Sequence, residues 1–163
     1  MRHKPWVMPL AGLLAVLAAA GYWAWRSGSG PDAPQRLRPA DGQVLQRGGR
    51  IYAQQCAACH GAHGEGQPDW RERGPDGLLP APPHDASGHT WHHPDEQLFA
   101  ITKYGLARLV SKPDYRTAMP IYEGVLSDEE IVAVLSWIKA QWPAEIRRRH
   151  DEINVQYRKS LSQ

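Results

Sequence analysis

Five consecutive residues, Cys56-Ala57-Ala58-Cys59-His60, carry the side chains best suited to chemistry in this sequence. Two cysteines separated by two residues and followed by a histidine are the attachment pattern of a c-type haem. Each thiol can add across one haem vinyl group, and the histidine can take one axial site on the iron. Two intervening residues make one helical turn, so both sulfurs can reach the same porphyrin edge. The motif predicts one covalent haem c held by Cys56 and Cys59, with His60 on the iron.

Two other sites can be built on a Cys-x-x-Cys pair: a thioredoxin-type redox pair, and half of a zinc site. The chain has only two cysteines, which excludes a four-cysteine zinc site. A thioredoxin-like site would need a β-α-β pattern, and the residues around the motif are poor in strand signals. A Cys₂His₂ zinc site stays open at this point, because the chain has eight histidines.

An apolar stretch of 20 residues, Trp6 to Trp25, precedes the motif. As a helix it would be about 30 Å long, which matches the hydrocarbon core of a bilayer. The basic residues Arg2 and Lys4 before it favour a cytoplasmic N-terminus. Residues 1–26 are therefore predicted to be a single-pass membrane anchor, with the rest of the chain outside the cytoplasm. A cleavable signal peptide is the alternative, with a cleavage site among the alanines at 18–20.

The composition predicts a linker after the apolar stretch and limits the class of molecule that the chain can bind. Residues 27–42 hold three prolines and no apolar period, which predicts a linker. Outside residues 1–26, which carry three of the 19 basic residues, 16 basic residues face 17 acidic ones. A chain so close to neutral, with no basic stripe, is not predicted to bind nucleic acid.

Helical periodicity and helix punctuation recur along the rest of the chain, without strand patterns. The predicted segments are Val44 to Cys59, Pro94 to Gly105, a helix opened by the capping box at Ser127 and ending near Pro143, and a charged helix over 144–160. Between His60 and Gly88 the chain is rich in proline and glycine and has no period. Such a long stretch is expected to wrap a large group, with a proline carbonyl accepting the second ring N–H of a ligand histidine.

A second axial ligand is predicted at Met119. Of the three methionines, it is the only one outside the N-terminal apolar region. It precedes Pro120, about 60 residues after His60, and leads into the capped helix. A methionine in an arbitrary position is usually core filler; this context favours a ligand.

The chain resembles the class I cytochromes c of the small bacterial monohaem type, carried on an N-terminal membrane anchor. The resemblance covers about residues 43–142 and rests on these motifs: Gly48-x-x-x-Tyr52, Cys56-x-x-Cys59-His60-Gly61, Met119-Pro120, and Leu126-Ser127-Asp128-Glu129-Glu130-Ile131 leading to Trp137. It implies an all-α cytochrome c fold, with three main helices and long loops around one covalent haem. It also implies that the first and last helices cross closely at Gly48, beside Tyr52 and Trp137.

Two segments lie outside the family's pattern, the histidine-rich loop and the charged C-terminal helix, residues 143–163. The histidines of the loop are His84, His89, His92 and His93. Three interpretations stay open: a copper or zinc site, a hydrogen bond from His89 or Trp91 to a haem propionate, and a solvated loop. One of the last two histidines replacing Met119 on the iron is a further alternative.

The predicted function is one-electron transfer by a membrane-tethered carrier that is not an enzyme. With His60 and Met119 on the iron no site is left for substrate, and methionine ligation raises the potential toward a donor role in a respiratory or related chain. Its partners would be redox proteins that dock through a small, transient contact. The resemblance places the haem domain on the periplasmic side of a bacterial inner membrane. Two alternatives remain: a haem peroxidase or gas sensor with a labile Met119, and a metal-handling module that uses the histidine loop.

Overall fold

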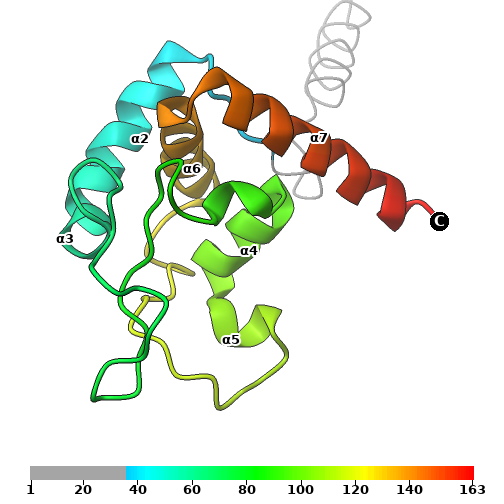
Figure 1. Cartoon of the computed structure of the whole chain (residues 1–163). Helices are drawn as coiled ribbons and strands as arrows, with labels where there is room; N and C mark the ends of the chain where they lie inside the picture. The colour runs from blue at the N-terminus through cyan, green and yellow to red at the C-terminus, as the bar shows by residue number, and fades with distance from the viewer. Residues whose placement is uncertain (1–35) are drawn as a thin grey trace, which may run out of the picture. The chain divides into compact units, whose positions relative to one another are not determined.

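Residues 36–163 are those that the computed structural model describes, and they are helical with long connecting loops (Figure 1). The predicted anchor at 1–26 and most of the predicted linker at 27–42 lie outside them. Within the described residues there is no β-strand, which agrees with the predicted all-α class. None of the helices between residues 36 and 163 has the length and apolar character needed to cross a bilayer.

Between residues 36 and 163, four long helices make up the framework, and the three predicted main helices are among them. They are α2 (Gly42–Gln55), α4 (Asp95–Tyr104), α6 (Asp128–Gln141) and α7 (Ala144–Leu161). Three short helices accompany them: α3 (Ala57–His60), the 3₁₀ turn η1 (Thr90–His92) and α5 (Leu106–Leu109). The stretch between His60 and Gly88, residues 61–88, has no regular helix or strand, as its composition predicts.

Side-chain caps fix the starts of α2 and α6. The Asp41 carboxylate accepts hydrogen bonds from the first-turn backbone N–H groups of α2, which satisfies donors that a helix start leaves free. At α6 the predicted capping box is confirmed. The Ser127 hydroxyl accepts from the Glu130 N–H at 3.3 Å, and the Glu130 carboxylate accepts from the Ser127 N–H at 2.9 Å.

The core forms where α2 crosses α6, and the predicted glycine notch lies at this crossing. A Cβ atom on Gly48 would overlap the Ala133 carbonyl oxygen and would lie 2.8 Å from the Trp137 Cβ. The rings of Tyr52 and Trp137 pack beside the notch with centroids 4.5 Å apart. The close approach of two backbones therefore requires a glycine here. Buried apolar residues of α6, with Ile131 at 0% exposure, continue the core on the inner face.

The C-terminal helix α7 folds back on the domain and is packed against it through polar side chains. His150 is fully buried and Asn154 is 3% exposed. The Asn154 side-chain oxygen accepts from the Asp95 N–H at 2.7 Å, and the Asp95 carboxylate accepts from the Leu37 N–H at 3.0 Å. The last residues of the predicted linker are thereby held against the start of α4.

Candidate haem site

The three residues of the attachment motif lie together at the junction of α2 and α3. Cys56 is the residue between the two helices, and the His60 N–H donates to its carbonyl at 2.9 Å. Both cysteines are free thiols, with Cys56 half-buried and Cys59 exposed. Gly61 ends the short helix with φ of +83°, a conformation that favours glycine. The motif therefore folds into one helical turn with both sulfurs available.

The imidazole of His60 is buried and oriented by the loop that follows it. Its Nδ1 lies 2.8 Å from the Pro82 carbonyl oxygen. Because a carbonyl can only accept, Nδ1 donates the proton and Nε2 keeps its lone pair, as a metal ligand requires. Burial lowers the pKa of His60, which the hydrogen bond to Pro82 partly offsets. The sequence predicted a proline carbonyl in this role, and the structure selects Pro82.

A second histidine lies against the first. The rings of His84 and His60 are stacked, with centroids 3.9 Å apart and an angle of 21° between the planes. Burial, followed by the neighbouring His60 and His89, lowers the pKa of His84 to about 3. His84 is thus a neutral, packed side chain. Sequence reasoning noted His84 in the histidine cluster and missed this stacking, because the 23 residues between His60 and His84 form an aperiodic loop.

Two hydroxyl groups tie the motif to the rest of the fold. The Tyr52 hydroxyl donates to the Gly61 carbonyl at 2.8 Å, and the Tyr122 hydroxyl donates to the Gln55 carbonyl at 2.7 Å.

Burial raises the pKa of the Cys56 thiol to about 11, with the neighbouring Cys59 as a further cause. The Cys56 sulfur is therefore held as the thiol, and its proton remains with it until the sulfur reacts.

Met119 lies in a different loop, half-buried in a cleft of about 390 Å³. The N–H of Met119 donates to the Thr117 hydroxyl at 3.1 Å. Apolar side chains share the cleft wall with Met119: Leu78, Leu106, Ala107 and Ile121. The cleft offers a thioether beside these apolar side chains, and Tyr115, Arg116 and Thr117 also line it. Ligation of one iron by Met119 and His60 stays a prediction.

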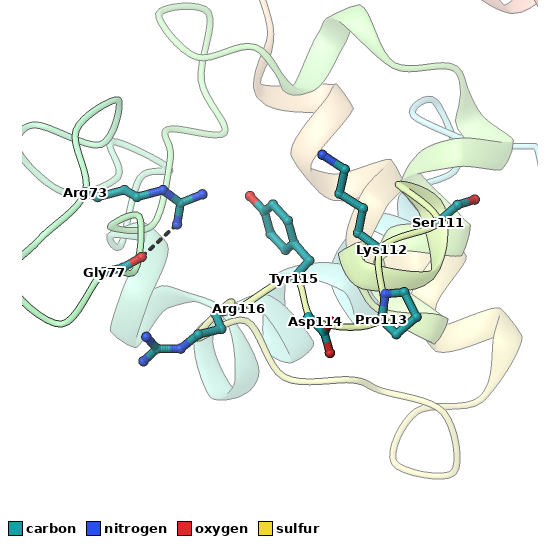
Figure 2. Close-up of a pocket in the computed structure, with 8 residues that line it drawn as sticks. All are labelled: Arg73, Gly77, Ser111, Lys112, Pro113, Asp114, Tyr115 and Arg116. Atoms are coloured by element: carbon teal, nitrogen blue, oxygen red, sulfur yellow. Dashed lines mark hydrogen bonds between the residues drawn. The ribbon is translucent and has the colours of Figure 1, made fainter.

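A cationic cleft of about 570 Å³ adjoins the apolar one and shares Tyr115 and Arg116 with it. Figure 2 shows its walls, the loop at Arg73 and Gly77 on one side and the segment 111–116 on the other. The Arg73 guanidinium donates to the Gly77 carbonyl at 2.7 Å. Lys112 adds a third cation, and Asp114 is the one acid in the lining. Sequence reasoning missed this cleft, because its cations are spread over more than 40 residues without a pattern.

The other members of the histidine cluster have separate surroundings. His89 is exposed and stacks on Trp70 with centroids 5.3 Å apart. The Trp91 indole N–H donates to the Ala86 carbonyl at 3.3 Å, and its ring stacks on His92. Among residues 36–163, no three His, Cys, Asp or Glu side chains come close enough together to hold a metal ion. The proposed copper or zinc site has no support in this arrangement.

Residues 43–138 match the protein family described as cytochrome c oxidase, cbb3-type, subunit III, over more than half of the chain. The chain belongs to this family. The family assignment confirms the predicted c-type cytochrome domain, whose function is haem-based electron transfer, and haem c as its covalent cofactor. Cys56 and Cys59 fit the attachment motif. Neither the curated proteins nor the solved structures contain a match to the chain.

The described residues fit this cofactor. The motif supplies two free thiols and an imidazole whose Nε2 keeps its lone pair. The two clefts described above hold Met119 and three cations, and no residue of the motif lines either of them.

Proposed function

We propose that the protein is a membrane-tethered one-electron carrier of a respiratory chain, with Cys56 and Cys59 holding haem c and with His60 and Met119 as the iron ligands. The observation that carries the proposal is the His60 ring, buried beside two free cysteines and fixed through Nδ1 by the Pro82 carbonyl at 2.8 Å. Haem c supplies an iron that alternates between the ferrous and ferric states. The protein's part is to hold the ligands and to limit access of water.

Each ligand has a distinct task in this proposal. The hydrogen bond to Pro82 fixes the tautomer of His60 and makes its Nε2 a stronger donor. Met119 would supply a soft thioether as the second ligand, which would favour the ferrous state and raise the potential. With both residues bound to the iron, no coordination site would be open to peroxide or a gas. An electron carrier follows from such a site more directly than an enzyme does.

The cationic cleft supports a role in holding the haem carboxylates. Arg73, Lys112 and Arg116 can each pair with a carboxylate, and the Tyr115 hydroxyl can donate a hydrogen bond. His89 and Trp91 remain the other proposed propionate contacts. The cleft is better equipped, because it carries three cations and adjoins the apolar cleft of Met119.

The tether and the partners are proposed from the sequence and the family. The apolar stretch from Trp6 to Trp25 would anchor the chain in a bacterial inner membrane by a single pass, with the haem domain on the periplasmic side. The family description names a subunit of a cbb3-type oxidase. We therefore propose that the electron acceptor is a terminal oxidase of that kind or a related redox protein, reached through a small transient contact.

The ligand assignment is tested by the absorption spectrum of the ferric holoprotein. The unaltered protein should show the weak far-red band that reports iron–methionine bonding. Met119→Ala should abolish this band and allow the ferrous protein to bind carbon monoxide. Ile121→Ala is the matched control, because it enlarges the same cleft without removing a ligand. A far-red band that survives in Met119→Ala would contradict the assignment. Carbon monoxide binding by the unaltered protein would favour the sensor or peroxidase alternative.

The tether is tested on the full chain. The protein should remain in the membrane fraction after alkaline carbonate extraction, and mass spectrometry should find residues 1–26 still attached. Release by carbonate, or a mature chain that begins after the alanines at 18–20, would replace the anchor by a cleaved signal peptide.

A further inference from the structure

The His60 ring is contacted in two ways, by a hydrogen bond at its Nδ1 edge and by a second ring stacked on one of its faces. Pro82 fixes the Nδ1 edge at 2.8 Å, and the stacked ring of His84 covers one face with centroids 3.9 Å apart. A histidine on an iron normally keeps one torsional freedom, rotation of its ring plane about the bond to the metal. A stacked neighbour that cannot move removes this freedom.

His84 is fixed by hydrogen bonds on three sides. Its backbone N–H donates to the Gly64 carbonyl at 2.7 Å, and its ring Nδ1 forms a hydrogen bond with the Thr90 hydroxyl at 2.9 Å. Its carbonyl accepts from the indole N–H of Trp142 at 2.7 Å. The backbone is thus held from both ends and the ring is held at its edge, so the ring cannot swing away from His60.

Trp142 connects this arrangement to the C-terminal part of the chain. It ends α6, is 2% exposed, and lies beyond the segment 43–138 that matches the family. Its ring meets the fully buried ring of His150 edge to face, with centroids 5.0 Å apart. The His150 Nε2 donates to the His93 carbonyl at 2.9 Å. Helix α7 therefore packs on Trp142 through the ring of His150.

We propose that Trp142 and His84 form a buttress that fixes the orientation of the His60 ring and shields it from water, so that residues outside the family's domain tune the reduction potential. The proposal rests on His60 being an iron ligand. Both buttress residues are positioning residues, because they act on the iron only through His60. Water stabilises the more highly charged ferric state, so loosening the buttress should lower the midpoint potential.

The decisive variant is Trp142→Phe in the ferric holoprotein. It keeps an aromatic ring and removes the N–H that holds the His84 carbonyl. We expect a lower midpoint potential and a changed pattern of hyperfine-shifted haem methyl signals in the NMR spectrum, which reports the orientation of the axial histidine. Trp137→Phe is the control. It also replaces a tryptophan of the α2–α6 core by a smaller ring, but the hydrogen bond to the His84 carbonyl comes from Trp142 and is kept.

A double-mutant cycle separates the buttress from a general loss of stability. In a His84→Leu background the ring that transmits the effect is gone, so adding Trp142→Phe should shift neither the potential nor the methyl pattern further. Equal effects of Trp142→Phe in both backgrounds, or equal effects of Trp142→Phe and Trp137→Phe, would overturn the proposal. An error in the Met119 assignment would appear separately, as a missing far-red band in the unaltered protein, and would leave this comparison unaffected.

Discussion

Because α2 and α6 cross so closely, one methyl group added at Gly48 should lower the free energy of unfolding substantially. In Gly48→Ala the new Cβ would overlap the Ala133 carbonyl oxygen and would lie 2.7 Å from its carbon. Carbon atoms pack at about 3.5–4.0 Å, so the helices must separate by roughly 1 Å, enough to forfeit a quarter to a half of each contact's attraction. The blocking atoms belong to the backbone, so no change of rotamer can relieve the overlap.

The expected net effect of Gly48→Ala combines two opposing terms. Overpacking of this kind costs about 3 kcal/mol, the upper part of its usual range. Alanine returns about 1 kcal/mol through its better helix propensity. The free energy of unfolding should therefore fall by about 2 kcal/mol, measured by guanidinium unfolding of the holoprotein with far-ultraviolet circular dichroism.

Two glycines of the same helix provide matched controls. A Cβ on Gly42 would meet nothing within 4 Å, so Gly42→Ala should be neutral or slightly stabilising. A Cβ on Gly49 would lie 2.9 Å from the Trp137 indole nitrogen, a side-chain atom that can shift, so Gly49→Ala should give an intermediate loss. A Gly48→Ala protein as stable as Gly42→Ala would refute the close crossing.

Three further predictions concern a cap, a buried histidine and the cationic cleft. Ser127→Ala should lower the free energy of unfolding by about 1 kcal/mol through loss of the capping box, whereas Ser160→Ala near the exposed C-terminus should have little effect. Burial lowers the pKa of His150 below 6.5, the value that the unfolded chain keeps. The contribution of His150 to the free energy of unfolding, measured with urea, should therefore be complete above pH 6.5. It should decline as the pH falls, by at most about 1.4 kcal/mol per pH unit. The decline should be smaller in His150→Gln. If the haem carboxylates lie in the cationic cleft as proposed, Arg73→Gln should lower the midpoint potential by removing a cation beside them. Arg71, whose guanidinium lies over the Trp70 ring, is the control, and Arg71→Gln should lower the potential less. Equal shifts in the two variants would show that the cleft does not hold the carboxylates.

Features encoded within a few residues could be predicted from the sequence. The capping box at Ser127 needs a partner three residues away, and the attachment motif needs five consecutive residues. The notch at Gly48 was predicted from the family resemblance, which supplies the distant partner that a single sequence does not. The first two patterns are specific because their geometry is set by one helical turn.

Contacts made by irregular loops could be predicted only as a class. A proline carbonyl was expected to accept from His60, and three prolines at 80–83 were available; the path of 22 residues between donor and acceptor selects Pro82. The stacking of His84 on His60 has no local signal at all. Loop conformation depends on many weak backbone contacts, such as the His84 N–H donating to the Gly64 carbonyl, rather than on a repeating pattern.

The C-terminal helix shows why a charged segment can still belong to a core. The sequence of α7 is charged and does not decide whether the helix packs on the domain or lies free. The structure nevertheless buries His150 and Asn154 against Asp95. Burying such groups is costly unless every donor and acceptor is paired, and here the Asp95 carboxylate is paired by the Asn154 amide at 3.1 Å and by the Leu37 N–H at 3.0 Å. His150 and Asn154 come from α7, whereas Asp95 and Leu37 come from the haem domain. The end of the family resemblance near residue 142 is therefore not a boundary between two independently folded parts.

This arrangement predicts that the haem domain depends on its C-terminal extension. A chain ending at Trp142 would lose the hydrogen bond from the Asn154 amide to the Asp95 carboxylate, worth about 1.5–3 kcal/mol for a bond to a charged group, and would expose Trp142 to water. We expect the guanidinium midpoint of the holoprotein to fall steeply and the protein to become sensitive to protease. A chain that lacks only the exposed residues 159–163 should keep the midpoint of the full chain. If both truncations unfold at the same denaturant concentration, α7 is an appendage and the polar network contributes nothing to the stability of the fold.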